Sequence, residues 1–125
     1  LWDSFKAQNF SMFVGSEKKL LNGLKVGAAG CISATTNVTG SIAKKVFDDF
    51  HKNGNSTEDE KLKAIRTIFD ETGNLISALH TLKSIENKSY ANMLPPLEML
   101  NEEKKKEMLN KLKKYNFLPN KNIAA

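Results

Sequence analysis

The stretch from Val14 to Val38, VGSEKKLLNGLKVGAAGCISATTNV, constrains the fold of this chain more than any other segment. A short apolar run at 12–14 predicts a buried strand, and leucines at helical spacing predict a helix over 17–26. A second strand is predicted over 31–34, after a glycine-containing turn. A strand, a helix and a second strand in this order form a βα unit that leads into the next strand. Units of this kind build parallel sheets and closed (β/α) barrels, so the predicted fold class is α/β.

The sequence beyond Val38 predicts helices and no further strand. Apolar residues recur there at helical spacing. The predicted helices cover residues 42–52, 58–72, 74–85 and 102–115. Thr39 or Ser41 is expected to cap the first of them and Asn101 the last, because hydroxyl and amide side chains accept hydrogen bonds from free backbone N–H groups. The proline pair at 95–96 is expected to force an extended entry into the last helix.

Three motifs in the opening stretch resemble the sequence around two strands of a known enzyme family. They are GSE at 15–17, GLKVGAAG at 23–30 and ISATTNV at 32–38. They resemble strands seven and eight of the pyruvate-dependent class I aldolases. That family includes N-acetylneuraminate lyase, dihydrodipicolinate synthase and 2-keto-3-deoxygluconate aldolase. The PPL motif at 95–97, which precedes a Glu/Lys-rich amphipathic helix, resembles the C-terminal end of the same family.

The resemblance implies that the chain is the C-terminal part of a TIM (β/α)8 barrel. Residues 1–55 would hold the last two βα units, and residues 56–125 would form a C-terminal helical segment. Residues 1–9 are then expected to be the end of a helix, and the N-terminal part of the barrel is expected to be absent from the chain. The Asn/Lys/Ala-rich tail that follows Pro119 is expected to be disordered.

The resemblance also implies a reaction. The family forms a Schiff base between pyruvate and a lysine at the end of barrel strand six, and a tyrosine on strand five moves the proton. No segment of this sequence matches either motif, so no catalytic residue is expected in this chain. The 125 residues alone are therefore expected to be inactive. The intact enzyme is expected to cleave a 2-keto-3-deoxy sugar acid to pyruvate and an aldehyde, without a cofactor.

The residues at the strand ends favour one member of the family. Neuraminate lyases carry a serine at the position of Ala34, and dihydrodipicolinate synthases usually carry Gly-Asp-Asp where this chain has GSE at 15–17. Ile-Ser-Ala, followed two residues later by Asn-Val, is most similar to the archaeal 2-keto-3-deoxygluconate aldolases. The other two enzymes remain alternatives. A third alternative is a non-enzymatic, small helical interaction module.

Five residues at the two strand ends are candidates for substrate binding: Gly15, Ser16, Glu17, Ala34 and Thr35. Gly15 leaves room for a ligand close to the backbone, and the Glu17 carboxylate can accept hydrogen bonds from substrate hydroxyls. The alternative is local, with Gly15 starting a turn and Glu17 capping the following helix. The resemblance implies substrate contacts from the Ala34 backbone and the Thr35 hydroxyl. For the hydroxyl, the alternative is a hydrogen bond to the backbone at the strand end.

The net charge of +5 does not indicate a nucleic-acid partner. Arg66 is the only arginine, whereas base and phosphate recognition usually employs arginine. Lysines and glutamates are interleaved, as in 102–107, which is typical of a solvated helix face. No apolar run approaches the ~20 residues that cross a bilayer, so no membrane partner is expected. The expected partners are a keto-acid substrate, the N-terminal part of the same enzyme and, from the resemblance, further copies in a homotetramer.

The remaining reactive side chains predict no further chemistry. Cys31 is the only cysteine, and it is expected to be buried and inert. A lone thiol also suits a reducing compartment such as the cytoplasm. His51 and His80 have no metal-ligand spacing to each other or to Cys31, so no metal site is expected. Lys83 follows the predicted strands on an amphipathic helix and is not expected to be a Schiff-base lysine.

Overall fold

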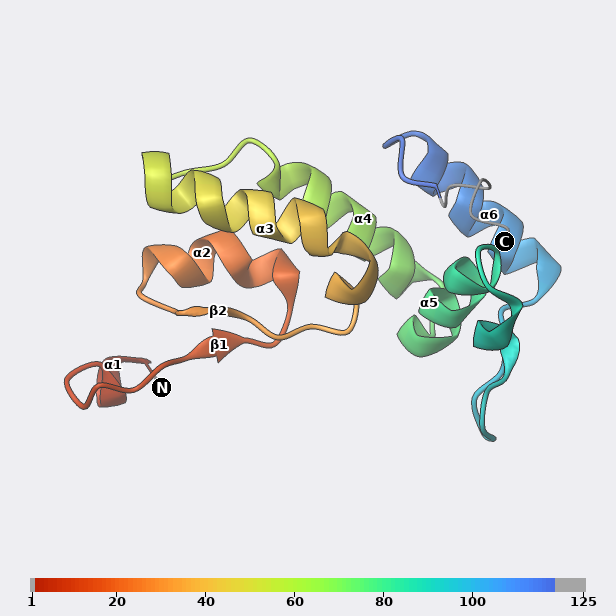
Figure 1. The fold of residues 1–125 in the computed structure, drawn as a ribbon, viewed down its shortest axis with the longest axis horizontal. Coiled ribbons are helices and arrows are strands. Elements are labelled where there is room, and N and C mark those ends of the chain that lie inside the picture. The colour runs from red at the N-terminus through yellow and green to blue at the C-terminus, as the bar shows by residue number, and fades with distance from the viewer. Residues whose placement is uncertain (1, 119–125) are drawn as a thin grey trace. The chain divides into compact units, whose positions relative to one another are not determined.

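The computed structural model describes residues 2–118, and Figure 1 shows the helices and strands. Its contacts divide the chain into two compact units, Leu1–Arg66 and Thr67–Ala125. The division falls inside helix α4 (Asp59–Glu71), so this helix contributes its first part to one unit and its last part to the other. The boundary predicted between residues 55 and 56 separates the last βα units of the barrel from the C-terminal helical segment, and it stays a prediction.

The first unit contains the predicted βα unit. Its elements are α1 (Trp2–Phe5), β1 (Phe13–Val14), the 3-10 turn η1 (Glu17–Lys19), α2 (Leu20–Lys25), β2 (Gly30–Cys31) and α3 (Thr36–Asn53). The two strands pair in parallel, with Phe13 opposite Gly30 and Val14 opposite Cys31. Figure 1 shows α2 beside the strands and α3 packed along α2. The predicted order of strand, helix and parallel strand is therefore confirmed.

Gly23 sets how closely α2 approaches the sheet. A Cβ atom at this position would lie 2.7 Å from Val14 Cγ1 and 3.4 Å from Ala28 Cβ. Since a valine side chain has little freedom to move away, only glycine fits here without displacing the strand. The close approach buries Leu20, Leu21 and Leu24 on the inner face of α2.

Apolar side chains of α2, α3 and α4 form the core of the first unit. The cluster contains Leu20, Leu21, Leu24, Ala43, Val46 and Leu62, and it is flanked by Cys31, Ile42, Phe47 and Phe50. The positions on α3 follow the helical period that the sequence predicted. Burial of this cluster fixes the helices against β1 and β2, and therefore fixes where the strands end.

The strands differ from the prediction in length and burial. They cover two residues each, rather than 12–14 and 31–34, and β1 is not buried on both sides. Phe13 is 49% exposed, and Ile32, just after β2, is 73% exposed. The physical reason is that α2 covers one face of a sheet that has only two strands in residues 2–118. Side chains of the opposite face have no described neighbour layer.

Helix α3 begins earlier than predicted. It starts at Thr36 rather than residue 42, and neither Thr39 nor Ser41 caps it. The Thr39 backbone N–H and its Oγ1 both donate to the Thr35 carbonyl, at 2.9 and 3.0 Å. Thr39 is therefore inside the first turn and fully buried. A hydroxyl that bonds back to the preceding turn competes with capping, and sequence pattern alone does not distinguish the two.

The first and last parts of the chain also differ from expectation. Helix α1 ends at Phe5, so the helix predicted to reach residue 9 is shorter, and Asn9 has a left-handed φ of 52°. The peptide between the prolines at 95–96 is cis. The tail predicted to be disordered, from 119 onward, lies outside the described residues.

The second unit consists of helices and loops in its described part, 67–118. It contains the end of α4, α5 (Leu75–Ser84), the 3-10 turn η2 (Lys88–Ala91) and α6 (Glu102–Lys113). Asn74 caps α5 and Asn101 caps α6, each accepting from a backbone N–H, so the predicted cap at Asn101 is confirmed. The buried apolar residues here are Ile68, Phe69, Ala78, Leu79, Leu82, Met108 and Leu112. Across residues 2–118, no helix combines the length and apolarity that a membrane span needs.

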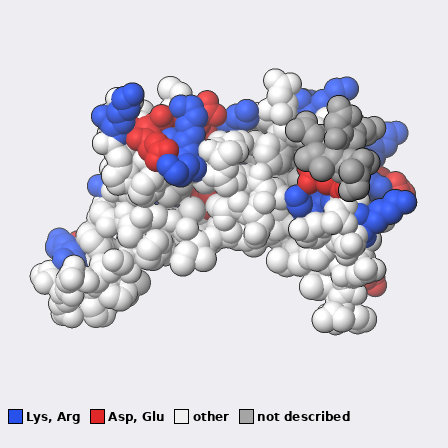
Figure 2. Space-filling model, viewed as in Figure 1, with Lys and Arg blue, Asp and Glu red and all other residues white. Residues whose placement is uncertain are grey.

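Charged side chains of both signs are interleaved on the surface. Figure 2 shows lysines beside acidic residues over the α3–α4 part of the first unit and over α6 of the second. Lys44 pairs with Asp48 and Lys45 with Asp49 along α3. In contrast, the surface over β1 and β2 carries few charged side chains in this view. The positive net charge is thus distributed over solvated helix faces.

Candidate active-site wall at the strand ends

Polar side chains meet where β1 and β2 end. Glu17 comes three residues after β1, and Ser33 and Thr35 follow β2. Because the strands are parallel, their carboxyl ends lie at the same edge of the sheet. Glu17 and Thr35 are both fully buried, whereas Ser33 is half-buried. In a βα architecture this edge is where functional side chains are presented.

Arg66 reaches the same place from helix α4. Its Nη1 atom lies 2.9 Å from Glu17 Oε2, 3.0 Å from Ser33 Oγ and 3.2 Å from Thr35 Oγ1. Ser33 Oγ donates to Glu17 Oε2, and Thr35 Oγ1 donates to Glu17 Oε1. We call these four residues the Glu17 cluster. It joins both strand ends to α4 through one buried carboxylate.

The cluster compensates the buried charge of Glu17. A buried carboxylate is tolerated when a cation and hydrogen-bond donors replace water. Arg66 supplies the cation and is only 14% exposed, and the two hydroxyls supply the donors. Nearby, burial raises the pKa of the Cys31 thiol, and the negative charge of Glu17 raises it further. The thiol therefore stays protonated at neutral pH and unreactive, although it is half-exposed rather than buried.

The five candidate binding residues have different surroundings. Glu17 and Thr35 are in contact, as described. A Cβ atom at Gly15 would have no neighbour within 4 Å, so space is open there. Ser16 caps η1, accepting from the Lys18 backbone N–H at 3.4 Å. The Ala34 carbonyl accepts from the Asn37 side chain at 2.9 Å.

The local alternative for Glu17 was that it caps the helix that follows β1. Ser16 takes the N-cap position instead, and the Glu17 carboxylate crosses to the end of β2. The two residues thus divide the roles that the sequence left open. Glu17 is committed to long-range contacts, with partners 16, 18 and 49 positions away.

Sequence reasoning missed Ser33 and Arg66 as members of the site. The signal for Ser33 was alternation, which places it on the opposite side of the strand from Ala34. The signal for Arg66 was its helical spacing. It lies four residues after Leu62 and next to Ile65, which are both fully buried, so its side chain starts from the inner face of α4. A lone arginine on an apolar helix face indicates a buried acidic partner.

Lys83 has the wrong environment for a Schiff-base lysine. Its Nζ lies 2.7 Å from Glu86 Oε2, and this hydrogen bond raises the pKa of Lys83 above its ordinary value. A nucleophilic amine needs a lowered pKa. The residues described, 2–118, also contain no group of three or more His, Cys, Asp and Glu side chains that could hold a metal ion. His51 and His80 instead contact the backbone carbonyls of Phe47 and Tyr90.

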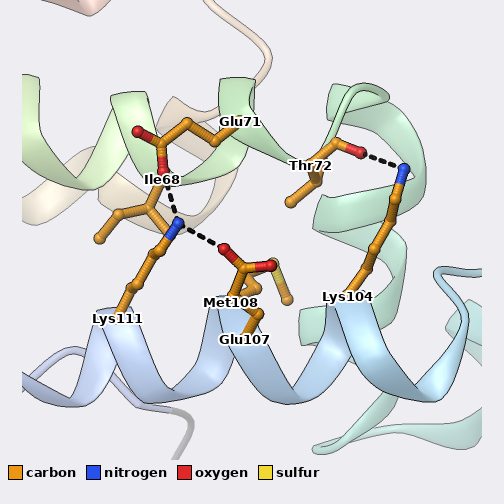
Figure 3. Close-up of a pocket in the computed structure, with 7 residues that line it drawn as sticks. All are labelled: Ile68, Glu71, Thr72, Lys104, Glu107, Met108 and Lys111. Atoms are coloured by element: carbon orange, nitrogen blue, oxygen red, sulfur yellow. Dashed lines mark hydrogen bonds and ion pairs between the residues drawn. The ribbon is translucent and has the colours of Figure 1, made fainter.

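A small pocket of about 60 Å³ lies in the second unit, where the end of α4 faces α6 (Figure 3). Figure 3 shows Lys111 pointing between Glu71 and Glu107, while Lys104 reaches the Thr72 carbonyl. The hydrogen bond from Lys111 to Glu107, with that to Glu71, raises the pKa of Lys111 to about 12. Both lysines that line the pocket are therefore already paired within the second unit.

The geometry at the strand ends can be compared with known proteins. The model of the dihydrodipicolinate synthetase family matches residues 4–115, nearly the whole chain and all of the Glu17 cluster. The chain belongs to this family. An uncharacterized DapA-like lyase from Chloroflexus aurantiacus is 33% identical over 95 residues, which are 74% of this chain and 31% of that protein.

Solved structures show the fold of this family member. A crystal structure of YagE, a prophage protein of the dihydrodipicolinic acid synthase family from E. coli K12 in complex with pyruvate, has a TM-score of 0.77. It is 18% identical, and the match covers 90% of this chain and 39% of YagE. N-acetylneuraminate lyase from Fusobacterium nucleatum has a TM-score of 0.71 at 21% identity, covering 94% and 40%. The chain has the α/β fold of part of a TIM barrel followed by helices.

The chain corresponds to less than half of each protein that it matches. It spans between 31% and 40% of the proteins it matches. Two βα units and a helical segment are present, and the predicted fold class is confirmed.

Proposed function

We propose that the intact protein is a class I aldolase that cleaves a 2-keto-3-deoxy sugar acid to pyruvate and an aldehyde. Cleavage proceeds through a Schiff base on a lysine outside residues 1–125. The observation that carries the proposal is the Glu17 cluster, which gathers one carboxylate and two hydroxyls at the ends of two parallel strands in a family member. The relative named as a lyase and the relative solved with pyruvate support the same reaction class.

This chain supplies the wall of the pocket that recognises hydroxyl groups. Open space at Gly15 lets the substrate approach the backbone, and Ser16, next to it, lies on the same edge. Glu17 and Thr35 act as hydrogen-bonding groups for the hydroxylated end of the substrate, and the Ala34 backbone lines the space beside them. Both oxygens of Glu17 have protein partners in the structure, so a substrate hydroxyl joins or replaces one of these bonds.

The substrate choice rests on Ala34 and on the GSE motif at 15–17. Alanine offers no hydroxyl where neuraminate lyases have a serine, which disfavours N-acetylneuraminate. A dihydrodipicolinate synthase usually has two acidic residues where this chain has Ser16 and Glu17. An unbranched 2-keto-3-deoxy sugar acid, such as 2-keto-3-deoxygluconate, fits a wall of this polarity. No cofactor takes part in the proposed reaction.

The open strands and the family resemblance support a proposal for the assembly. The exposed Phe13 and Ile32 side chains and the free sheet edges would be covered by the N-terminal part of the same enzyme. The intact enzyme is proposed to form a homotetramer, as the resemblance implies. The free Cys31 thiol supports a reducing compartment, for which we propose the cytoplasm.

A substrate panel tests this function. The intact enzyme is incubated with 2-keto-3-deoxygluconate, N-acetylneuraminate, or pyruvate plus aspartate semialdehyde, and pyruvate release or consumption is followed. We expect the highest kcat/KM with 2-keto-3-deoxygluconate. A higher value with either of the other two would assign the enzyme to that activity. Turnover of none of them, in a folded protein, would contradict the proposal.

A further inference from the structure

We propose that Arg66 is a positioning residue of the substrate site. It holds the Glu17 carboxylate, which keeps the Ser33 proton on Glu17 and leaves a Ser33 lone pair to accept a hydrogen bond from the substrate. The inference rests on the proposed function, because it assigns the hydroxyl-recognising contact within that same site. It adds Arg66 and Ser33 to the proposed site, with Ser33 as a further substrate contact beside Glu17 and Thr35. The observation behind it is that one guanidinium nitrogen approaches three members of the Glu17 cluster within 3.2 Å.

The exposure of the cluster identifies which group a substrate can reach. Glu17 and Thr35 are fully buried, so a substrate hydroxyl reaches them only by joining or replacing one of their present bonds. Ser33 is half-buried and is the member that combines a hydroxyl with access from outside. A substrate that enters from the exposed side would therefore meet Ser33 before Glu17.

The hydrogen-bond directions determine what Ser33 offers. Its proton is donated to Glu17 Oε2, and one of its lone pairs faces Arg66 Nη1 at 3.0 Å. A hydroxyl has one proton and two acceptor lone pairs. Thr35 Oγ1 lies 3.2 Å from Ser33 Oγ, but its own proton is donated to Glu17 Oε1, so the second lone pair of Ser33 remains an acceptor. Ser33 can therefore accept a hydrogen bond from a substrate O–H. The chemical class that fits is a hydroxylated aldehyde portion that donates a hydrogen bond, rather than an alkyl chain.

Arg66 is suited to this role because its helix is anchored close to it. Leu62, one turn before Arg66 on the same helix, packs in the core cluster of the first unit, and Ile65 next to Arg66 is fully buried. The planar guanidinium keeps its nitrogens at fixed angles, whereas a lysine ammonium would be a single flexible charge. Loss of Arg66 would free Glu17 to turn and would leave the Ser33 proton without a fixed acceptor.

The test uses the intact enzyme and two acceptor aldehydes of equal chain length. Condensation of pyruvate with glyceraldehyde is compared with condensation with propionaldehyde, which lacks both hydroxyls. For Arg66→Gln, Arg66→Lys and Ser33→Ala, we expect the preference in kcat/KM for glyceraldehyde to fall about tenfold, mainly through KM. The variant Glu17→Gln/Arg66→Gln should lose no more than the worse of its single variants, because the two residues act as one unit. Lys44→Gln, on the exposed face of α3, is the matched control and should keep the wild-type preference.

Borohydride trapping of the pyruvate imine distinguishes a failure of the proposed function from a failure of the positioning role of Arg66. If the wild-type protein forms no imine and cleaves no substrate, the proposed function fails. If the variants form the imine at the wild-type level and keep the wild-type preference, the positioning role is wrong while the function stands. If Arg66→Gln does not fold, Arg66→Lys and the double variant Glu17→Gln/Arg66→Gln decide by the same preference in kcat/KM for glyceraldehyde over propionaldehyde. Additive losses in the pair would also overturn the proposal.

Discussion

An ion-pair cluster in the first unit and one in the second differ in how deeply they are buried. They are the Glu17 cluster and the set of Lys111, Glu71 and Glu107, which we call the Lys111 cluster. In the first unit, one carboxylate is fully buried, and its arginine and hydroxyl partners come from segments far apart in sequence. In the second unit, Lys111 is 37% exposed and bridges two glutamates that are more exposed than it is. Both clusters contain an ion pair shorter than 3 Å. The difference lies in how much water each charge has lost.

This difference determines what each cluster can do. Exposed ion pairs contribute little to stability because water already solvates both charges. Substitutions in the Lys111 cluster should therefore change the free energy of unfolding only slightly. A buried pair costs solvation on both sides, and removal of one partner leaves an uncompensated charge. The Glu17 cluster therefore links the two strand ends to α4 and also holds polar groups in a fixed arrangement. Function is expected where a protein holds polar groups out of water in a defined arrangement.

The sharpest test of this comparison is removal of each cation. We expect Arg66→Ala to lower the free energy of unfolding by about 3–5 kcal/mol, because Glu17 would stay buried without its cation. Lys111→Ala should cause a much smaller loss, since both of its glutamates can turn into water. Urea unfolding of both variants at pH 7 measures the pair. Equal losses in the two would break the comparison.

The second test asks whether the units have separate cores. Leu112 is fully buried in the second unit, and Leu112→Ala should cost about 2–5 kcal/mol through lost burial and a residual cavity. Amide hydrogen exchange shows where the loss falls. We expect Leu112→Ala to reduce protection from exchange more over residues 67–118 than over residues 2–66. Uniform loss over both ranges would mean that the chain unfolds as one cooperative unit.

Two glycines in helices allow a matched test of packing in the first unit. Gly23→Ala adds a methyl group that meets Val14 at 2.7 Å, and the overpacking, about 1–3 kcal/mol, should exceed the gain in helix propensity. At Gly40, in α3, the same methyl group has no neighbour within 4 Å. Gly40→Ala should therefore stabilise the protein by up to about 1 kcal/mol. Thermal unfolding compares them, and stabilisation by both substitutions would show that β1 and α2 can move apart.

The smallest expected effect concerns pH dependence in the second unit. The hydrogen bond from Lys111 lowers the pKa of Glu107 below its ordinary value. A lowered carboxyl pKa stabilises the folded state above pH 4.5, and this contribution is lost as the pH falls through the lowered pKa. The raised pKa of Lys111 stabilises below pH 10.5, and that contribution is lost as the pH rises through about 12.

Lys111→Gln should remove the effect on Glu107. In an NMR titration of the side-chain carboxyl, we expect the pKa of Glu107 to return toward its ordinary value. The pKa of Asp49, which Ser56 and Lys45 lower in the first unit, serves as the control and should not change. A Glu107 pKa unaffected by the substitution would mean that the Lys111 contact is not populated in solution.

The sequence predicted the helices of the second unit well and the strand ends poorly. Asn101 was identified as a cap because capping is local and uses a few residue types. The start of α3 was missed because Thr39 bonds back to the helix instead of capping it. The role of Arg66 depends on a partner 49 positions away, and no periodicity or local motif encodes that distance. Local sequence patterns could therefore not predict the long-range polar contacts at the site.

The family resemblance supplied what local patterns could not. Gly15, Glu17 and Thr35 were assigned to one edge because the motifs matched adjacent parallel strands, and the structure brings Glu17 and Thr35 together. The parallel pairing of β1 and β2 confirms the arrangement on which that assignment depended. The extent of the strands and the exposure of Phe13 differ because local apolarity does not reveal how many strands a sheet has.

The central claim is that this chain provides substrate recognition while the reactive lysine lies elsewhere in the enzyme. Pyruvate is trapped on the intact protein with borohydride, and the modified peptide is identified by mass spectrometry in the wild type and in Glu17→Gln. The account predicts a pyruvyl adduct outside residues 1–125 in both proteins, with a roughly ten- to hundredfold lower kcat/KM for cleavage in Glu17→Gln. An adduct on a lysine of this chain, Lys83 above all, would contradict it.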